Sequence, residues 1–316
     1  MAASLRIRAS SNRSFFVAFA CVAPTMSKKK ERAQLDPRTE ALFTRKGYKV
    51  MDKISEGAFG KVYTAAKITT GDPCAVKVMD LERCSEKFRS KFLPRELSIL
   101  TQVKHPNVIY IFDIFRANNK IYIFMELAPN GTIADYLKGH GALSEKKTRE
   151  WFFQLADALT FLHNNLGIAH RDMKVENILF NANWECKLTD FGFARVCFDL
   201  NTGLLRLSET FCGTEPYYAP EIIEREPYNP FLADVWATGV VLFAMLNNRF
   251  PFHYQDLKTM LKEQYAHAYK WRPGIEEQTS KECKDLLWRM LDADTKKRLV
   301  MSEVMEHVWM KSYKRR

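Results

Sequence analysis

The chain has 316 residues, of which 47% are hydrophobic and 13% aromatic, enough apolar material for a sizeable core in one large domain or two lobes. Its formal net charge is +11, but the excess lies in the ends, because residues 1–49 carry 11 Lys and Arg against 3 Asp and Glu, and residues 311–316 add four basic side chains and no acid. The body is close to neutral and has no basic stripe, so we expect no nucleic-acid partner.

The first 30 residues lack acids and contain the apolar run Phe15–Ala23. This run is far shorter than the roughly 20 residues that cross a bilayer, so we expect no transmembrane segment. Residues 1–47 are predicted to form a basic extension, and three interpretations of it stay open: a disordered segment, an organelle signal, or a true start at Met26. The seven cysteines form no C-x-x-C pair, which favours free thiols in a reducing compartment.

Short strands are predicted after Tyr48 because β-branched and aromatic residues alternate with turn signals. The candidate strands are YKVMDKI, KVYTAAKI and PCAVKVM, followed by two apolar strands around the turn Asn118-Asn119. Between them, residues 88–103 (FRSKFLPRELSILTQV) carry leucines at helical spacing, which predicts a helix.

After Gly131 the pattern becomes mainly helical, with apolar residues at helical spacing in EWFFQLADALTFLHNNLGI, ADVWATGVVLFAML and KECKDLLWRML. We therefore expect an α+β fold in two lobes. A small antiparallel, β-rich N-lobe with one main helix spans residues 48–127, and a larger, mostly helical C-lobe spans 128–310. A hinge falls near Met125–Pro129, and residues 311–316 form a basic tail.

Five motifs follow one another in this frame. ISEGAFGKVY (54–63) matches a phosphate-cradling glycine loop, G-x-G-x-x-G-x-V, except that Ser55 replaces the first glycine. C-A-V-K then ends at Lys77 on the third strand, and H-R-D-M-K-V-E-N spans residues 170–177. D-F-G begins at Asp190, and A-P-E ends at Glu221. Each string alone is weak evidence, but the ordered set resembles that of protein kinases over residues 48–310.

The resemblance implies ATP and Mg²⁺ as substrate and metal, and it implies a role for each matching residue. Lys77 would hold the α- and β-phosphates and pair with Glu96, and Asp172 would accept the proton of the substrate hydroxyl. Lys174, as in Ser/Thr kinases, would steady the γ-phosphate. Asn177 and Asp190 would hold Mg²⁺. The expected ATP contacts come from Ile54, Ser55, Glu56, Gly57, Ala58, Phe59, Gly60, Lys61 and Val62 in the glycine loop, from Ala75, Lys77 and Leu179, and from Met125, Glu126, Leu127 and Ala128 in the hinge.

Three further residues match structural roles of the family. Glu221 and Arg298 resemble the ion pair that anchors the A-P-E segment. Asp234 resembles the helix residue that braces the catalytic loop. The alternative function is a pseudokinase or scaffold that keeps the fold, but the set of catalytic residues is complete, which favours an active enzyme.

Finer strings, including KFLPRELSIL, IYIFMEL, LSETFCGT and CKDLLWRML, resemble the testis-specific serine/threonine kinases, a branch near the calmodulin-dependent group. This resemblance implies a cytoplasmic enzyme of spermatids or sperm, with the flagellum or nucleus as alternative locations. It also implies protein substrates, and a chaperone or sibling kinases as partners. The loop Gly213-Thr214-Glu215-Pro216-Tyr217-Tyr218 departs from the family's G-S-A-A-Y-A, which leaves the peptide preference near that loop open.

The resemblance also implies regulation. Thr210 stands at the position phosphorylated in related kinases, with Arg171 and Arg195 placed to receive the phosphate and Ser208 as a rival acceptor. We expect Thr214 to bond Asp172 and Lys174.

Two substrate-related positions remain. Glu176 stands where related kinases read an upstream arginine, so a degenerate peptide library is expected to show a mild preference for basic residues. The usual second acid after the hinge is replaced by Thr132, with Asp135 one turn on.

If the backbone at Ser55 must be left-handed, the strain of a non-glycine residue costs about 1–2 kcal/mol, whereas an extended backbone at Ser55 carries no such cost. We therefore expect Ser55→Gly to lower the Michaelis constant for ATP modestly.

Overall fold

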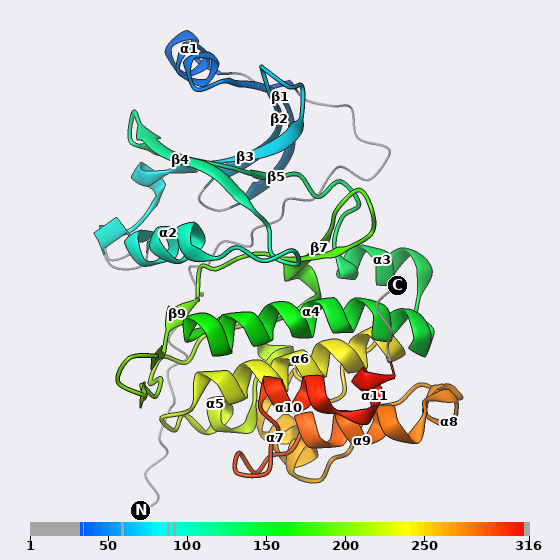
Figure 1. The fold of residues 1–316 in the computed structure, drawn as a ribbon. Coiled ribbons are helices and arrows are strands. Elements are labelled where there is room, and N and C mark those ends of the chain that lie inside the picture. Colours follow the sequence, from blue (N-terminus) through cyan, green and yellow to red (C-terminus); the bar gives the residue numbers. More distant parts are fainter. Residues whose placement is uncertain (1–31, 34, 58–59, 87–88, 91–92, 313–316) are drawn as a thin grey trace, which may run out of the picture.

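A computed structural model describes residues 32–33, 35–57, 60–86, 89–90 and 93–312. These residues form two lobes, a small sheet-containing lobe above a larger helical one (Figure 1). The small lobe is an antiparallel five-stranded sheet in the order β1-β2-β3-β5-β4, as predicted. Its elements are α1 (Pro37–Arg45), β1 (Tyr48–Gly57), β2 (Gly60–Lys67), β3 (Pro73–Asp80), η1 (Leu81–Arg83), α2 (Leu93–Gln102), β4 (Ile111–Ala117) and β5 (Lys120–Glu126).

Two local features follow directly from residue chemistry. Asn118 and Asn119 connect β4 to β5 with φ angles of 48° and 55°. A two-residue hairpin turn of type I′ requires positive φ at both positions, which asparagine tolerates better than most residues. Of the helix predicted over 88–103, the structure describes α2 from Leu93 to Gln102, whereas residues 88, 91 and 92 lie outside the described residues.

Both faces of the sheet are covered. On β3, Ala75 and Met79 point into a hydrophobic core shared with the large lobe, whereas Cys74 and Val76 point into a second, smaller core. This division follows the two-residue period of a strand. α2 lies under the first face and α1 over the second (Figure 1).

Helix α1 corrects the expectation that all of residues 1–47 form a disordered or targeting extension. Asp36 caps the helix by accepting a hydrogen bond from the Thr39 backbone at 3.0 Å, and Pro37 occupies the first turn. Phe43 is 1% exposed and packs edge-on against Tyr122 and Phe124, with ring centroids 5.0 and 5.5 Å away. The folded small lobe therefore begins before residue 48. Residues 1–31, which include Met26 and the apolar run, lie outside the described chain.

The large lobe is built around α4 and α6, with three two-stranded sheets beside them. Its elements are α3 (Ile133–His140), α4 (Glu145–Leu166), β6 (Ile168–Ala169), η3 (Val175–Asn177), β7 (Ile178–Phe180), β8 (Cys186–Leu188), β9 (Arg195–Val196), β10 (Phe198–Asp199), β11 (Leu204–Leu205), η4 (Glu215–Tyr217), α5 (Pro220–Glu224), α6 (Pro230–Asn247), α7 (Leu257–Tyr265), α8 (Ile275–Gln278), α9 (Lys281–Met290), α10 (Met301–Glu306) and α11 (Val308–Lys311). α6 is the single described helix that is long and apolar enough to cross a membrane, and 89% of that stretch is buried inside the lobe.

Glu145, at the start of α4, joins three parts of the large lobe. Its carboxylate accepts hydrogen bonds from the Ser280 hydroxyl at 2.7 Å and from the Trp309 indole at 2.7 Å, and it pairs with Arg149 at 2.9 Å. Burial alone would raise the pKa of Glu145, but these hydrogen bonds and the Arg149 charge overcome that effect and lower it. The last described helix is thus fixed to α4.

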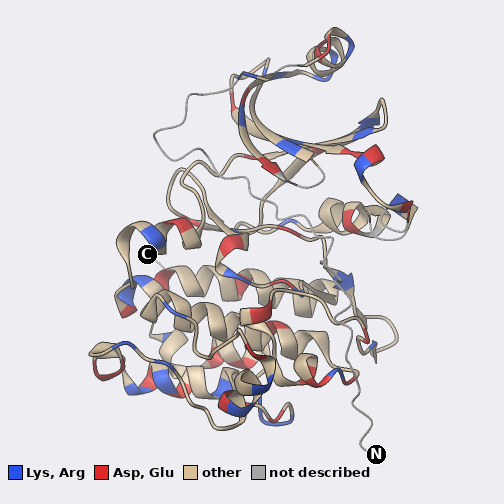
Figure 2. Cartoon of the chain, turned by 180° about the vertical axis from the view of Figure 1, so that it is seen from behind, with Lys and Arg blue, Asp and Glu red and all other residues tan. Residues whose placement is uncertain are grey.

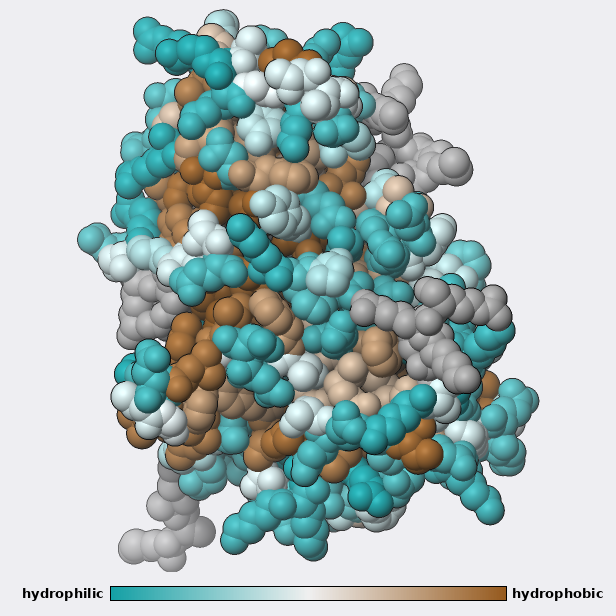
Figure 3. Space-filling model, in the orientation of Figure 1, coloured by the Kyte–Doolittle hydropathy of each residue, from teal (hydrophilic) through white to brown (hydrophobic). Residues whose placement is uncertain are grey.

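The surface matches the composition. Lys and Arg are interspersed with Asp and Glu over both lobes of the described chain (Figure 2). The six described cysteines are free and buried. Apolar side chains gather on the side of the molecule where β9 lies (Figure 3). Val196, Leu204 and Leu207, in the segment that follows D-F-G, are about half exposed.

Candidate active site

The catalytic loop between β6 and η3 is held by hydrogen bonds to one buried carboxylate. Asp234, on α6 and 1% exposed, accepts hydrogen bonds from the backbone amides of His170 and Arg171, both at 2.7 Å. His163 holds the same carboxylate at 2.9 Å. Arg171 adopts a φ of 65°, which is strained for a non-glycine residue, and these bonds keep the loop in that conformation.

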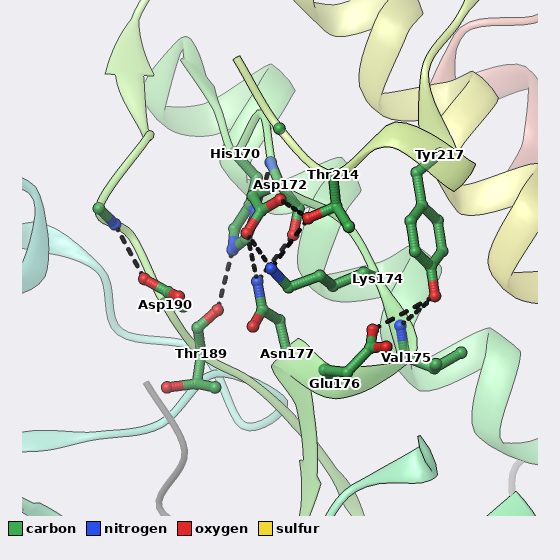
Figure 4. A network of polar contacts seen from close by, with 12 residues as sticks. His170, Asp172, Lys174, Val175, Glu176, Asn177, Thr189, Asp190, Thr214 and Tyr217 are labelled. Carbon is green, nitrogen blue, oxygen red and sulfur yellow. Dashed lines mark hydrogen bonds and ion pairs between the residues drawn. The ribbon is translucent and has the colours of Figure 1, made fainter. Parts of the chain in front are cut away.

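Asp172 lies at the centre of a polar network (Figure 4). Its Oδ2 accepts hydrogen bonds from Lys174 Nζ at 2.6 Å and from the Asn177 amide at 3.0 Å, and its Oδ1 accepts one from the Thr214 hydroxyl at 2.9 Å. Lys174 also donates to Thr214 at 3.0 Å, so Thr214 bonds both residues as expected. Hydrogen-bond donors on both oxygens fix the orientation of this carboxylate, and Asp172 as a whole is 4% exposed.

His170 supports this network as a neutral imidazole. It is fully buried, and burial lowers the pKa of its ring below the usual value. Nε2 lies 3.0 Å from the Thr189 carbonyl, and Nδ1 accepts from the Asp172 amide at 3.3 Å. The hydrogen bonds therefore assign the proton to Nε2. His170 ties the catalytic loop to the strand that leads into D-F-G.

Asp190 and Asn177 sit on either side of this connection. Asp190 is 3% exposed, has a φ of 64°, and accepts from the Gly192 amide at 3.3 Å. The side-chain nitrogen of Asn177 donates a hydrogen bond to the backbone carbonyl of Asp172 at 2.8 Å and a second one to the carboxylate of Asp172. The side-chain oxygen of Asn177 is therefore the atom left to act as a ligand.

Lys77 and Glu96 are both almost fully buried, at 2% and 3% exposure, on β3 and α2. Burial raises the pKa of Glu96, and the positive charge of Lys77 acts in the opposite direction. Burying two charges of opposite sign costs desolvation free energy, unless the charges interact with each other or with a ligand. The third-strand lysine and the helix glutamate are thus both buried, and the lysine charge acts on the glutamate, whereas a direct ion pair between them stays a prediction.

The glycine loop is a hairpin between β1 and β2. Glu56 forms ion pairs with Lys53 on the same strand at 3.3 Å and with Lys61 on β2 at 3.7 Å. Gly60 is required by space, because a Cβ there would collide with the Val78 carbonyl. Gly57 pairs with Gly60 at the end of the two strands. The predicted contacts Ala58 and Phe59 lie outside the described residues.

Ser55 lies within β1 and pairs with Val62, and it is not among the residues with positive φ. Its backbone is therefore extended, and the left-handed penalty does not apply. This corrects the expectation for Ser55→Gly. We expect the Michaelis constant for ATP to stay within about twofold of wild type, since no strain of 1.4 kcal/mol, the value of a tenfold change, is relieved. Steady-state kinetics at varied ATP tests this, and a tenfold decrease would contradict it.

Several of the residues expected to contact ATP belong to one buried hydrophobic cluster that includes residues of both lobes. Val62 and Ala75 from the sheet and Leu179 from β7 belong to the same buried cluster, together with Met125 and Ala128. Ile54 and Leu127 pack against this cluster and are partly buried. Glu126, at the end of β5, forms an ion pair of 2.7 Å with Lys187 on β8.

In the segment between D-F-G and A-P-E, Thr210 is exposed, whereas Ser208 is fully buried. Arg171 donates to the Phe193 carbonyl at 2.7 Å and to the Ser208 hydroxyl at 3.2 Å. Arg195 is half-buried and pairs with Ala169 between β9 and β6. Burial removes Ser208 as a rival acceptor and leaves Thr210 accessible.

Glu176 and Asp135 differ in their availability to a substrate. Glu176 is exposed and accepts from the Tyr217 hydroxyl at 3.3 Å, a contact that the sequence did not reveal. Asp135 forms a capping box with Thr132, accepting from its hydroxyl at 2.7 Å. Its carboxylate is therefore used in starting α3.

Glu221 and Arg298 form a two-point ion pair with N–O distances of 2.6 and 3.0 Å. The Arg298 side chain is fully buried. It also donates to the Leu232 and Asp292 carbonyls, and it lies 4.9 Å from the centre of the Trp236 ring. This pair fixes the A-P-E segment to the large lobe.

A two-lobed fold with a braced aspartate in its catalytic loop and a buried lysine on its third strand defines a protein kinase. The family model of the protein kinase domain matches residues 48–310, and the chain belongs to this family.

Relatives refine the class. The chain is 37% identical over 271 residues to mouse testis-specific serine/threonine-protein kinase 1, covering 85% of this chain and 73% of the relative. It is 38% identical over 268 residues to mouse testis-specific serine/threonine-protein kinase 3, covering 84% and 97%. A rice CBL-interacting protein kinase 32 is 36% identical over 270 residues, covering 85% and 60%. The chain is a serine/threonine protein kinase.

Proposed function

We propose that this kinase transfers the γ-phosphate of ATP to serine and threonine hydroxyls of proteins in developing male germ cells. The observation that carries the chemistry is the position of Asp172, whose two carboxylate oxygens are held by Lys174, Asn177 and Thr214. A fixed carboxylate orients the acceptor hydroxyl and accepts its proton as the bond to phosphorus forms.

The buried charges supply the rest of the site. Lys77 binds the α- and β-phosphates, and Glu96 keeps the lysine in place. Lys174, which touches both Asp172 and Thr214, neutralises charge on the γ-phosphate during transfer. Phosphoryl transfer relies on positioning and charge neutralisation, and these are the two contributions that Lys77, Lys174 and Asp172 make.

Asp190 and Asn177 fit a magnesium site in their donor chemistry. Mg²⁺ prefers oxygen ligands and takes one or two from the protein, with phosphate oxygens and water completing its shell. Asp190 supplies a carboxylate, and the hydrogen bonds of the Asn177 amide nitrogen leave its oxygen for this purpose. When bound, the metal would neutralise phosphate charge.

The germ-cell role rests on the names of the relatives at 37–38% identity, which are testis-specific kinases of mouse. We expect the protein in the cytoplasm of spermatids, associated with a chaperone or sibling kinases. Quantification with a specific antibody across tissues and cell fractions tests this. Enrichment in spermatid cytosol supports the role, and equal amounts in liver, brain and testis would contradict it.

Phosphorylation of Thr210 is expected to activate the enzyme. A phosphate adds about −1.5 to −2 charge, and Arg171 already reaches the neighbouring Ser208. Because each new charge-assisted hydrogen bond contributes about 1.5–3 kcal/mol, Thr210→Ala is expected to lower kcat/KM about tenfold or more.

The measurement compares Thr210→Ala with wild type before and after phosphatase treatment. Thr202→Ala, an exposed threonine in the β10–β11 turn, is the matched control and should behave as wild type. If Thr210→Ala phosphorylates as fast as phosphorylated wild type, the role of Thr210 is wrong.

A further inference from the structure

A pocket lies on the outer face of the small lobe's sheet, the face over which α1 lies (Figure 1). We call it the outer pocket. Its floor is formed by β2, β3 and β5, and its roof by Leu35, Asp36 and Thr39, where the chain enters α1. Its volume is about 330 Å³. A cavity of about 150 Å³ holds one benzene ring, so the outer pocket has room for a body of about two rings.

The floor of the outer pocket is a row of side chains on one face of three neighbouring strands. Lys61 on β2 pairs with Val78 on β3, and Val78 pairs with Tyr122 on β5. Tyr63, two residues after Lys61, lies on the same face of β2 and also lines the pocket. Tyr63 and Tyr122 are 7% and 1% exposed. The floor therefore suits a flat apolar or aromatic body.

Tyr122 brings a polar group to this floor. Its ring lies 5.0 Å from the Phe43 ring and 5.3 Å from the Phe115 ring, measured between centroids. Its hydroxyl forms no hydrogen bond with any residue that the structure describes. Because buried hydroxyl groups are nearly always hydrogen-bonded, the outer pocket is the place from which a partner would come.

The two acids that line the outer pocket are already used by the backbone nearby. Asp36 accepts hydrogen bonds from the Thr39 amide at 3.0 Å and from the Thr39 hydroxyl at 2.6 Å. Asp80 accepts one from the Glu82 amide at 3.0 Å and lies 3.8 Å from Arg83 Nε. Both carboxylates cap the start of a helix, so they are not available to recognise a cation.

The lysines of the outer pocket are less engaged. Lys120 lies opposite Asp80 in the pairing of β3 with β5, yet its ammonium group forms no ion pair with a described residue. It lies two residues before Tyr122 on the same face of β5, about 7 Å along the strand. Lys61 pairs with Glu56 at 3.7 Å, and both side chains are 41% exposed, which makes that contact weak. The charge that would complete the pocket is therefore negative.

We propose that the outer pocket binds a small molecule that has a flat apolar body of about two rings and one anionic group. The body lies on Tyr63 and Val78 beneath Leu35, and the anionic group accepts hydrogen bonds from Lys120 and from the Tyr122 hydroxyl. The roof residues precede residue 48, where the match to the protein kinase domain begins, so the pocket depends on a part of the chain outside that match. The proposal does not rest on the proposed kinase activity.

The test compares two probes of the same shape, naphthoate, which is anionic, and naphthamide, which is neutral. Each is titrated into the full chain by calorimetry, with Mg²⁺ and ADP in excess so that the nucleotide site is filled. Wild type should bind naphthoate at one site, roughly five- to tenfold more tightly than naphthamide, because only the anion forms a charge-assisted hydrogen bond with Lys120.

Three variants locate the binding. Lys120→Met keeps the apolar stem and removes the charge, so it should weaken naphthoate binding roughly five- to tenfold and leave naphthamide binding within about twofold of wild type. Val78→Trp fills the floor and should abolish the binding of both probes. Lys49→Met is the matched control, because it removes an exposed lysine of the same sheet that does not line the pocket, and it should bind both probes as wild type does.

Lys120→Met changes a side chain at the rim of the pocket, so it decides the matter even if Val78→Trp fails to fold. Equal affinity of wild type for the two probes, binding of neither probe, or a naphthoate affinity that Lys120→Met leaves unchanged would overturn the proposal.

Discussion

Asp172→Asn is expected to lower kcat by about 10²–10⁴-fold, the usual contribution of a positioned general base. Asparagine keeps the size of the side chain and one oxygen for Lys174 and Asn177 to bond, so the loop should stay folded. It removes the negative charge and the proton acceptor that face the substrate. The affinity for ATP should remain within about twofold, because this carboxylate acts on the acceptor hydroxyl.

The measurement is transfer of labelled phosphate from ATP to a generic protein, together with nucleotide binding by each variant. Asp72→Asn, in the exposed turn between β2 and β3, removes the same charge away from the site and should keep wild-type activity. Equal labelling by Asp172→Asn and wild type would mean that this site does not catalyse the reaction.

Arg298→Met is expected to produce the largest loss of stability, about 3–5 kcal/mol of the free energy of unfolding. The substitution leaves the Glu221 carboxylate, 12% exposed, without its cation in a low-dielectric region. It also removes donors to the Leu232 and Asp292 carbonyls. For a domain of this size, the melting temperature should fall by roughly 10 °C.

Thermal unfolding monitored by circular dichroism checks this loss. Lys297→Met provides the control, since Lys297 forms an ion pair with Asp294 while its side chain is 72% exposed, and such pairs contribute about 0–1 kcal/mol. Adding Glu221→Gln to Arg298→Met should recover part of the loss, because the unpaired charge is removed. A melting temperature unchanged by Arg298→Met would show that the pair does not anchor the A-P-E segment.

The core of the site could be predicted from sequence because phosphoryl transfer demands particular residue types in a fixed order. Asp172, Lys174 and Thr214 meet as expected, although Thr214 is 40 residues from Lys174 along the chain. The brace from Asp234 and the ion pair of Glu221 with Arg298 followed from the same motif set.

Other features were not predicted from the sequence. Helix α1 was missed because residues 1–49 look basic and polar as a whole, although Asp36 before Pro37 is a helix-start signal that was present. The burial of Ser208 and the extended backbone of Ser55 are set by partners distant in sequence or across a strand, Tyr228 and Val62. Gln264 on α7, a helix that carries no kinase motif, donates a hydrogen bond to the Tyr218 carbonyl at 2.8 Å, which the sequence did not reveal.

Phosphoamino-acid analysis of a generic protein incubated with the wild-type enzyme, Mg²⁺ and ATP labelled at the γ-phosphate tests the central claim most directly. The arrangement of Asp172, Lys174 and Thr214 predicts label on serine and threonine, and loss of that label when the metal is chelated. Label confined to tyrosine, or no label at all, would contradict the assignment of this chain as an active serine/threonine kinase.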